Sequence, residues 1–333
     1  MASEPTRNLA LELVRVTEAA ALSAGRFMGR GDKIAADRAA VDAMRLVLNS
    51  IMMNAVIVIG EGEKDEAPML FNGERVGNGE GPEMDIAVDP IDGTRPLSNG
   101  SWNAISTVAL APRGTMFDPG PFMYMDKIAV GPQAKGAVDI KAPIADNLHA
   151  IAKASGKQVD DLTIVILDRP RHEELIAQVR KAGARIRLIL DGDVAGALMT
   201  SWPDSGIDAL MGIGGTPEGV LAACALRAMG GEIQGKLYAR TEKILQRGRE
   251  MGYDFDKVLT MDDLVASEDV FFAATGITDG EFLDGVNYTG SGARTDSLVV
   301  RGQTGTVRQI IATHRWDKLN RFSAINYQSS QEP

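Results

Sequence analysis

Apolar residues near the start of the chain recur at helical spacing and predict two helices, one on either side of a turn at 29–33. Short apolar runs then predict strands at 55–60 and 84–89, and acidic residues follow each run directly. Two more strands are expected before residue 131, and a helix after residue 143. The N-terminal part therefore combines helices with several strands.

Beyond that helix the pattern changes to alternating units, each a short apolar run followed by a helical pattern. The runs lie at 163–168, 185–191 and 207–215. Such alternation is typical of a parallel sheet with crossover helices. The last apolar runs, within 296–314, resemble a hairpin that fits either half. We therefore predict an α/β fold with two sheet-containing subdomains, 1–155 and 156–333.

Charge and composition narrow the classes of partner. The 333 residues include 35 Lys and Arg against 45 Asp and Glu, a net charge of −10. This excess of acids argues against non-specific nucleic-acid binding and suits a protein that gathers carboxylates around cations. No apolar run is long enough to cross a bilayer, and the first residues lack a signal-like apolar core. We expect a cytoplasmic protein without a membrane partner.

Cysteine and histidine usage limits the metal chemistry. The sequence has one cysteine, Cys224, and three widely spaced histidines, His149, His172 and His314. An intrachain disulfide, a thiolate zinc site and an HExxH zinc centre are thereby excluded. A metal here must be a hard cation bound by oxygen, such as Mg²⁺ or Mn²⁺.

The most specific motif is VDPIDGT at 88–94, which follows an apolar strand. Asp89 and Asp92 place two carboxylates at the carboxyl end of that strand, where α/β sheets usually bind ligands. Gly93 permits a tight turn, and Thr94 adds a hydroxyl beside the acids. The alternative is an ordinary turn, because Asp, Pro and Gly all favour turns.

A second acidic segment, GEGEKDE at 60–66, follows the other N-terminal strand. Glu61 is expected to join Asp89 and Asp92 around a cation, because carboxylates gathered without one repel each other. Residues 63–66 are interpreted as a solvated acidic loop.

Two further acids lie near predicted helix starts. Asp37 follows GRGDK, and Glu218 lies in GIGGTPEGV at 212–220. Each fits a helix-capping or dipole role, and each also fits a carboxylate in the same site. The glycines before Glu218 suit a bound phosphate, although the sequence is neither a Walker A loop nor GxGxxG. Lys33 is available for phosphate.

The strand ends of the second half carry basic and acidic pairs. Arg169 and Arg171 suit bidentate phosphate binding, and Asp191 and Asp193 suit sugar hydroxyls. Helix capping is the alternative for both pairs. Tyr124 is either a core-edge residue or a hydrogen-bond donor to phosphate.

Together these motifs resemble the class II fructose-1,6-bisphosphatases, within the lithium-sensitive, inositol-monophosphatase-like phosphatase superfamily. The resemblance spans residues 7–315 and rests on motifs in the family's order: GRGDK, AAD, IGEGE-x-DEAPML, DIAVDPIDGT, MYM-x-K, PRH, DGDVA and GIGG-x-PEGV. It implies a layered α-β-α-β-α sandwich, a homodimer or homotetramer, and dependence on Mg²⁺ or Mn²⁺.

The resemblance also implies roles for individual residues. Thr94 and Asp37 would be catalytic. The metal ligands would be Asp37, Glu61, Asp89, Ile91 through its carbonyl, Asp92 and Glu218. The substrate contacts would be Lys33, Asp92, Gly93, Thr94, Tyr124, Arg169, Arg171, Asp191, Gly192, Asp193 and Gly215.

The expected reaction is metal-assisted hydrolysis of the 1-phosphate of fructose 1,6-bisphosphate, in gluconeogenesis or the Calvin cycle. Similarity around DRPRH and DGD implies possible use of sedoheptulose 1,7-bisphosphate as well. One alternative is another phosphatase of the superfamily, acting on inositol monophosphate or a nucleotide 3′-phosphate. Another is a catalytically silent regulator that binds sugar phosphate.

Overall fold

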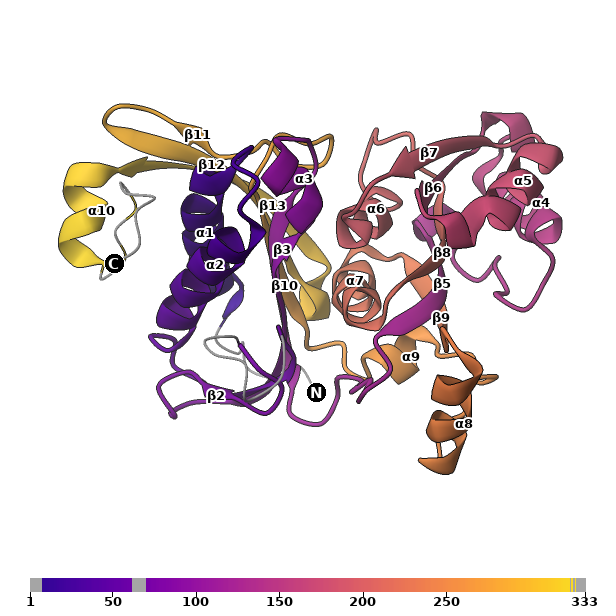
Figure 1. Ribbon diagram of the computed structural model, residues 1–333, viewed down its shortest axis with the longest axis horizontal. Helices are drawn as coiled ribbons and strands as arrows, with labels where there is room; N and C mark the ends of the chain where they lie inside the picture. Colours follow the sequence, from indigo (N-terminus) through magenta and orange to yellow (C-terminus); the bar gives the residue numbers. More distant parts are fainter. Residues whose placement is uncertain (1–7, 62–69, 324, 326, 328–333) are drawn as a thin grey trace.

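Five layers, α-β-α-β-α, follow one another along the long axis of the computed structural model, which describes residues 8–61, 70–323, 325 and 327 (Figure 1). One outer layer is α1 (Ala10–Ala24) and α2 (Lys33–Leu48). The other outer layer is α4 (Ile144–Ser155) and α5 (Glu173–Ala182). Between the sheets lie α6 (Asp193–Met199) and α7 (Thr216–Met229). The predicted layered α/β architecture is confirmed.

The first sheet has strand order β11-β12-β10-β4-β3-β1-β2, with β13 paired to β12. Its strands are β1 (Asn54–Ile59), β2 (Arg75–Val76), β3 (Glu83–Asp92), β4 (Ile105–Pro112), β10 (Phe271–Gly276), β11 (Asn287–Tyr288), β12 (Gly292–Arg301) and β13 (Thr306–Arg315). β1 runs parallel to β3, whereas β4 is antiparallel to both β3 and β10. The C-terminal hairpin, which fitted either half of the sequence, thus returns to the first sheet.

The second sheet has strand order β7-β6-β8-β5-β9. Its strands are β5 (Tyr124–Val130), β6 (Thr163–Leu167), β7 (Arg185–Ile189), β8 (Ala209–Gly215) and β9 (Glu232–Leu237). β6 is parallel to β7 and β8, as the alternating pattern predicts, but β5 is antiparallel to β8 and β9. The parallel pairing predicted for the alternating units is therefore confirmed, and the sheet as a whole is mixed because β5 enters from the N-terminal part in the opposite direction. The division into subdomains at residue 155 stays a prediction.

Shorter helices complete the described chain. The α-helices are α3 (Thr94–Asn99), α8 (Glu242–Glu250), α9 (Met261–Leu264) and α10 (Trp316–Phe322). Single 3₁₀ turns lie at Gly25–Phe27, Pro132–Ala134, Val159–Asp161, Pro170–His172 and Gly302–Thr304. Among the helices of the described residues, none combines the length and the apolar character that crossing a bilayer requires.

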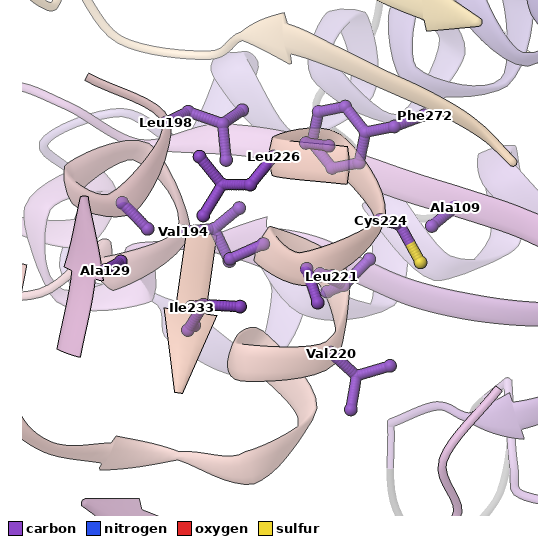
Figure 2. Packing of buried hydrophobic residues seen from close by; sticks show 14 of the residues in the cluster. Ala109, Ala129, Val194, Leu198, Val220, Leu221, Cys224, Leu226, Ile233 and Phe272 are labelled. Carbon is purple, nitrogen blue, oxygen red and sulfur yellow. The ribbon is translucent and has the colours of Figure 1, made fainter. Parts of the chain in front are cut away.

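The central helix α7 is buried on nearly all sides, as its apolar sequence requires. Figure 2 shows Leu221, Cys224 and Leu226 of this helix in one buried cluster with Phe272 of the first sheet and Ile233 of the second. The largest core cluster therefore joins both sheets through α7, whose first turn carries Glu218.

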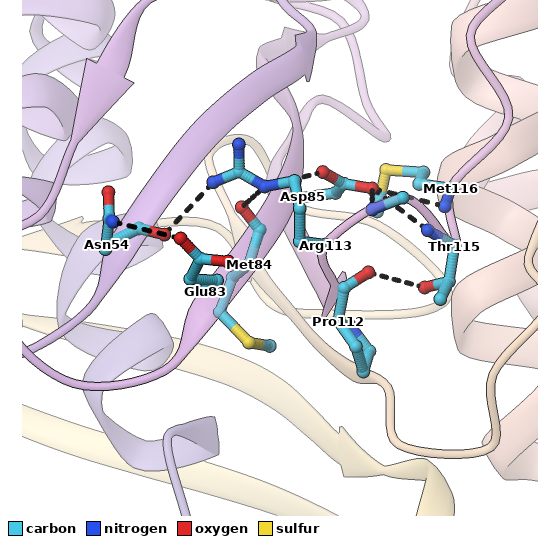
Figure 3. A network of polar contacts seen from close by, with 9 residues as sticks. Asn54, Glu83, Met84, Asp85, Pro112, Arg113, Thr115 and Met116 are labelled. Atoms are coloured by element: carbon cyan, nitrogen blue, oxygen red, sulfur yellow. Dashed lines mark hydrogen bonds and ion pairs between the residues drawn. The ribbon is translucent and has the colours of Figure 1, made fainter.

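The N-terminal end of β3 is fixed by a buried carboxylate (Figure 3). Asp85 Oδ2 accepts hydrogen bonds from the N–H groups of Gly114 at 2.6 Å and Thr115 at 3.2 Å. Arg113 Nε lies 3.2 Å from Asp85 Oδ1. These bonds tie the start of β3 to the segment directly after β4, so Asp85 has a structural role at the end of β3 opposite to Asp92.

The other end of β3 contains an irregularity that positions two acids. The strand extends through Asp92, beyond the predicted end at residue 89, and its register against β4 shifts between Asp89 and Asp92. Residues three apart normally face opposite sides of a sheet, but one extra residue restores the same side. Asp89 and Asp92 therefore both face the middle layer.

Candidate active site

Four carboxylates from three separate segments gather where the first sheet meets the middle layer. Glu61 follows β1, Asp89 and Asp92 end β3, and Glu218 lies in the first turn of α7. Burial raises the pKa of Asp89 well above its usual value, and Asp92, Glu61 and Glu218 raise it further. The sequence separations hide this group, and the fold brings it together.

The pKa values of the neighbouring acids are raised in the same way. Burial, followed by Asp193 and Glu218, raises the pKa of Asp92 well above its usual value. Burial and Asp37 raise the pKa of Glu61 to about 7. Burial and Asp193 raise the pKa of Glu218 to about 7. Without a cation, the folded chain therefore favours the protonated forms of these acids, because burying several unpaired carboxylates together is unfavourable.

The Glu218 carboxylate packs closely against the backbone of Gly215. A Cβ at Gly215 would lie 1.6 Å from Glu218 Oε2, so a side chain at residue 215 would displace the carboxylate. Within the described residues, Glu218 Oε2 is buried without a hydrogen-bond partner. An acceptor in this state requires a donor or a cation to offset its lost hydration.

Asp37 and Thr94 lie beside the acids. Asp32, not Asp37, caps α2, because its Oδ1 accepts the N–H of Ala35 at 3.0 Å. Asp37 is therefore available to Thr94, whose Oγ1 lies 3.4 Å from Asp37 Oδ1 and 3.3 Å from the Ile91 carbonyl oxygen. Burial raises the pKa of Asp37 to about 6, although Thr94 and Lys33 oppose the rise.

The turn before α6 brings its two acids to the same region. Gly192 has a φ of 87°, which suits glycine, and it lies between Asp191 and Asp193. Asp191 Oδ1 lies 3.3 Å from Arg169 Nη2. Burial raises the pKa of Asp191, while Arg169 lowers it. Asp92 Oδ2 accepts the N–H of Ala195 at 3.4 Å, which joins β3 to α6.

Cationic and aromatic groups gather at the ends of β5 and β8. The Arg171 guanidinium donates to the Ile213 carbonyl from Nε at 3.0 Å and from Nη2 at 2.7 Å. Its centre lies 5.7 Å from the Tyr124 ring centroid. Burial lowers the pKa of Arg171, and the neighbouring charges of Arg169 and Arg240 lower it further. A cluster of cations that repel each other suits a bound dianion.

Two residues of this region were missed by the sequence interpretation. Arg240 Nη1 donates to Tyr124 Oη at 3.3 Å, and its guanidinium lies 4.9 Å from the ring centroid. Lys127 is buried, and its Nζ lies 2.6 Å from Asp193 Oδ2. The motif MYM-x-K contains Lys127, but alternation within a strand alone does not reveal its partner.

The described parts of the chain hold no group of three or more His, Cys, Asp or Glu side chains already arranged to hold a metal ion. The donors nevertheless fit a hard cation in kind, since the gathered groups are carboxylates and Glu218 Oε2 lacks a partner. Two softer donors are engaged elsewhere: His172 binds the Leu167 carbonyl and the Ile213 N–H, and Cys224 is buried in the core. Of the predicted acidic loop, residues 63–66 lie outside the described residues.

Comparison with known proteins now identifies the family. The sequence profile described as "Bacterial fructose-1,6-bisphosphatase, glpX-encoded" matches residues 7–314. The chain belongs to this family. A protein of Escherichia coli strain K12 named "Fructose-1,6-bisphosphatase 1 class 2" is 46% identical over 325 residues, covering 94% of this chain and 96% of its own. Proteins named "Fructose-1,6-bisphosphatase class 2", from Escherichia coli O6:H1 and Shigella flexneri, match to the same extent.

The resemblance to class II fructose-1,6-bisphosphatases is thereby confirmed. The matched span includes every residue predicted for the site. The individual roles of these residues stay predictions, because family membership does not test them one by one.

Proposed function

We propose that this chain hydrolyses the 1-phosphate of fructose 1,6-bisphosphate, giving fructose 6-phosphate and inorganic phosphate. The observation that carries this proposal is the presence of two polar groups of different charge, one acidic and one basic. Buried acids lie beside Thr94, whereas Arg171, Arg240 and Tyr124 gather at the ends of β5 and β8. A substrate with two phosphates on one sugar matches this arrangement.

The acids would hold divalent cations, Mg²⁺ or Mn²⁺, through Asp37, Glu61, Asp89, Asp92, Glu218 and the Ile91 carbonyl. The unpartnered Glu218 Oε2 and the raised pKa values of these carboxyls support this assignment. When bound, such cations neutralise phosphoryl oxygens and stabilise the leaving alkoxide.

Thr94 and Asp37 would prepare the attacking water. Thr94 Oγ1 would accept a hydrogen bond from the water and donate its own hydrogen to Asp37 Oδ1. The Asp37 carboxylate, with its pKa near 6, would be ready to accept a proton at neutral pH. The water oxygen would then bond to phosphorus as the bond from phosphorus to the sugar oxygen breaks.

The remaining residues would orient the sugar. Arg169, Arg171 and Tyr124 would hold the distant 6-phosphate, while Asp191 and Asp193 would accept hydroxyl hydrogens. The backbone at Gly93, Gly192 and Gly215 allows close approach of the substrate. Lys33 would face the phosphate, since its charge acts on both Asp37 and Asp191. Fixing a remote phosphate orients the reacting one.

The same site would accept sedoheptulose 1,7-bisphosphate if the sugar end tolerates one more carbon. Inositol monophosphate, a nucleotide 3′-phosphate and binding without turnover are the competing functions. The arginine group favours a bisphosphate sugar over inositol monophosphate, which has no second phosphate. As in the sequence interpretation, we also propose a homodimer or homotetramer.

A substrate panel tests the proposal. Phosphate release is measured with fructose 1,6-bisphosphate, sedoheptulose 1,7-bisphosphate, inositol 1-phosphate and adenosine 3′,5′-bisphosphate, in Mg²⁺ and Mn²⁺ separately. Fructose 1,6-bisphosphate should give a high kcat/KM, and Glu61→Gln should lower it by orders of magnitude. Asp85→Asn, which alters a buried carboxylate at the other end of β3, is the matched control. Release from inositol 1-phosphate alone would overturn the proposal.

A further inference from the structure

Lys127 is a buried lysine that connects two turns of the site. It lies in the middle of β5 with 3% of its surface exposed. Its Nζ lies 2.6 Å from Asp193 Oδ2 and donates to the Gly215 carbonyl oxygen at 2.8 Å. Asp193 begins α6, and Gly215 ends β8 directly before α7. One ammonium group therefore holds the starting points of both helices of the middle layer.

The sheet itself does not need this ion pair. β5 is already bonded on both sides, with Lys127 opposite Gly212 of β8 and Gly235 of β9. Burying an ammonium and a carboxylate costs more than burying apolar side chains of similar size, even when the two are paired. A lysine at this position therefore points to a task that its charge performs.

The surrounding glycines keep the path of the Lys127 side chain open. A Cβ at Gly214 would lie 2.0 Å from Asp193 Oδ2 and 3.0 Å from Lys127 Nζ. A side chain at residue 214 would thus separate the ammonium from the carboxylate. The end of β8 lacks side chains where Lys127 and Asp193 meet.

We propose that Lys127 is a positioning residue for the sugar-binding and acidic parts of the site, an inference that rests on the proposed function. Its ammonium engages Asp193 Oδ2, so that Oδ1 is left to face a sugar hydroxyl. Its bond to the Gly215 carbonyl fixes the turn that carries Glu218. The ammonium thereby sets the distance between the turn at Asp193, which would bind the sugar, and the turn that carries Glu218.

Kinetic analysis of four variants tests this role. Lys127→Met keeps the length of the side chain and removes its charge, and we expect KM for fructose 1,6-bisphosphate to rise about tenfold to a hundredfold. Lys127→Arg should recover part of the loss. Asp193→Asn should raise KM as well. The KM of the double variant Lys127→Met/Asp193→Asn should not exceed that of the poorer single variant, because both single variants and the double variant remove the same interaction.

Lys236→Met is the matched control. Lys236 lies on the adjacent strand β9, opposite Asp126 of β5. Lys127 pairs with the preceding residue of β9, Gly235, so the pleat directs Lys236 to the other face of the sheet. It should leave KM and kcat as in the unchanged enzyme. If the role of Lys127 is purely structural, Lys127→Met should lower the melting temperature and the active fraction while KM stays constant. That result would overturn the proposal.

A second measurement does not depend on turnover. Hydrogen exchange without substrate should be faster in Lys127→Met than in Lys236→Met at residues 193–197 and 215–219. Unchanged exchange there would overturn the proposal. If Lys127→Met fails to fold, the pair Lys127→Met/Asp193→Asn balances the buried charge, and its KM should equal that of Asp193→Asn. A pair variant with the unchanged KM would overturn the role. If the unchanged enzyme fails to hydrolyse fructose 1,6-bisphosphate, the proposed function fails, while the exchange result still decides on Lys127.

Discussion

Thr94 Oγ1 lies 3.4 Å from Asp37 Oδ1, although 57 positions separate the two residues in the sequence. α3 begins at Thr94 directly after the bulged end of β3, and Asp37 lies in the second turn of α2. Because Asp32 caps the beginning of α2, the carboxylate of Asp37 has no part in capping that helix. The hydrogen bond therefore joins two side chains, and neither is needed for the helix in which it lies.

Asp37→Asn should lower kcat by about a hundredfold to ten-thousandfold, because an amide cannot accept a proton from Thr94. The measurement is steady-state kinetics with fructose 1,6-bisphosphate at saturating Mg²⁺ or Mn²⁺. Asp32→Asn is the control on the same helix and should leave kcat unchanged, since Asn also caps well. Equal kcat values for the two variants would remove Asp37 from the reaction.

Without divalent cations, the free energy of unfolding should fall as pH rises from about 4.5 to about 7. The pKa of Glu61 and that of Glu218 are each raised to about 7 in the folded chain, from a usual value of 4.5. The folded chain therefore binds more protons than the unfolded chain in this window, so raising the pH favours unfolding. Thermal melts after EDTA treatment, at pH 5.5 and pH 8, measure the effect.

Added Mg²⁺ or Mn²⁺ should raise the melting temperature more at pH 8 than at pH 5.5, because protons compete with the cation at the lower pH. Glu218→Gln should reduce this difference. An equal rise at both pH values would show that the stabilising cations bind elsewhere.

Gly215→Ala should lower kcat strongly while the chain stays folded. The added Cβ would lie 1.6 Å from Glu218 Oε2, so the carboxylate must leave its place among the acids. Gly290→Ala is the matched control, because a Cβ at residue 290 meets no atom within 4 Å. Circular dichroism checks the fold, and kcat decides the outcome. A Gly215→Ala enzyme as active as Gly290→Ala would contradict the assignment of Glu218.

Arg171→Ala and Arg240→Ala should each raise KM for fructose 1,6-bisphosphate about tenfold or more, with a smaller change in kcat. Both guanidinium groups lie near Tyr124, at 5.7 Å and 4.9 Å from its ring centroid. Arg180→Ala, on the exposed part of α5, is the control. If neither site variant changes KM, the distant phosphate binds elsewhere.

The order of helices and strands follows from the sequence because periodicity and glycine turns are local signals. Helices near the N-terminus and strands β1, β6 and β8 are predicted within a few residues. The end of β3 is not, since the pattern gives no sign that the strand continues through Pro90 with a register shift. The direction of β5 also depends on which distant strand it joins.

The acids of the site are recognisable because each directly follows a strand or begins a helix. Lys127 and Arg240 were not recognised, because their roles depend on partners in other elements, Asp193 and Tyr124. The same limit applied to Asp37, whose sequence position fits a cap as well as a site residue. Only the bond from Asp32 to Ala35 distinguishes the two.

The central position of α7 has a consequence for heat inactivation. If α7 detaches, the inner apolar face of each sheet becomes exposed to water, because residues of α7 share one buried cluster with strands of both sheets. A half-melted molecule with one intact sheet would expose that face to water and would also lose the carboxylate at the beginning of the helix. Loss of turnover on warming should therefore coincide with loss of the whole tertiary structure, with no inactive but otherwise native form in between.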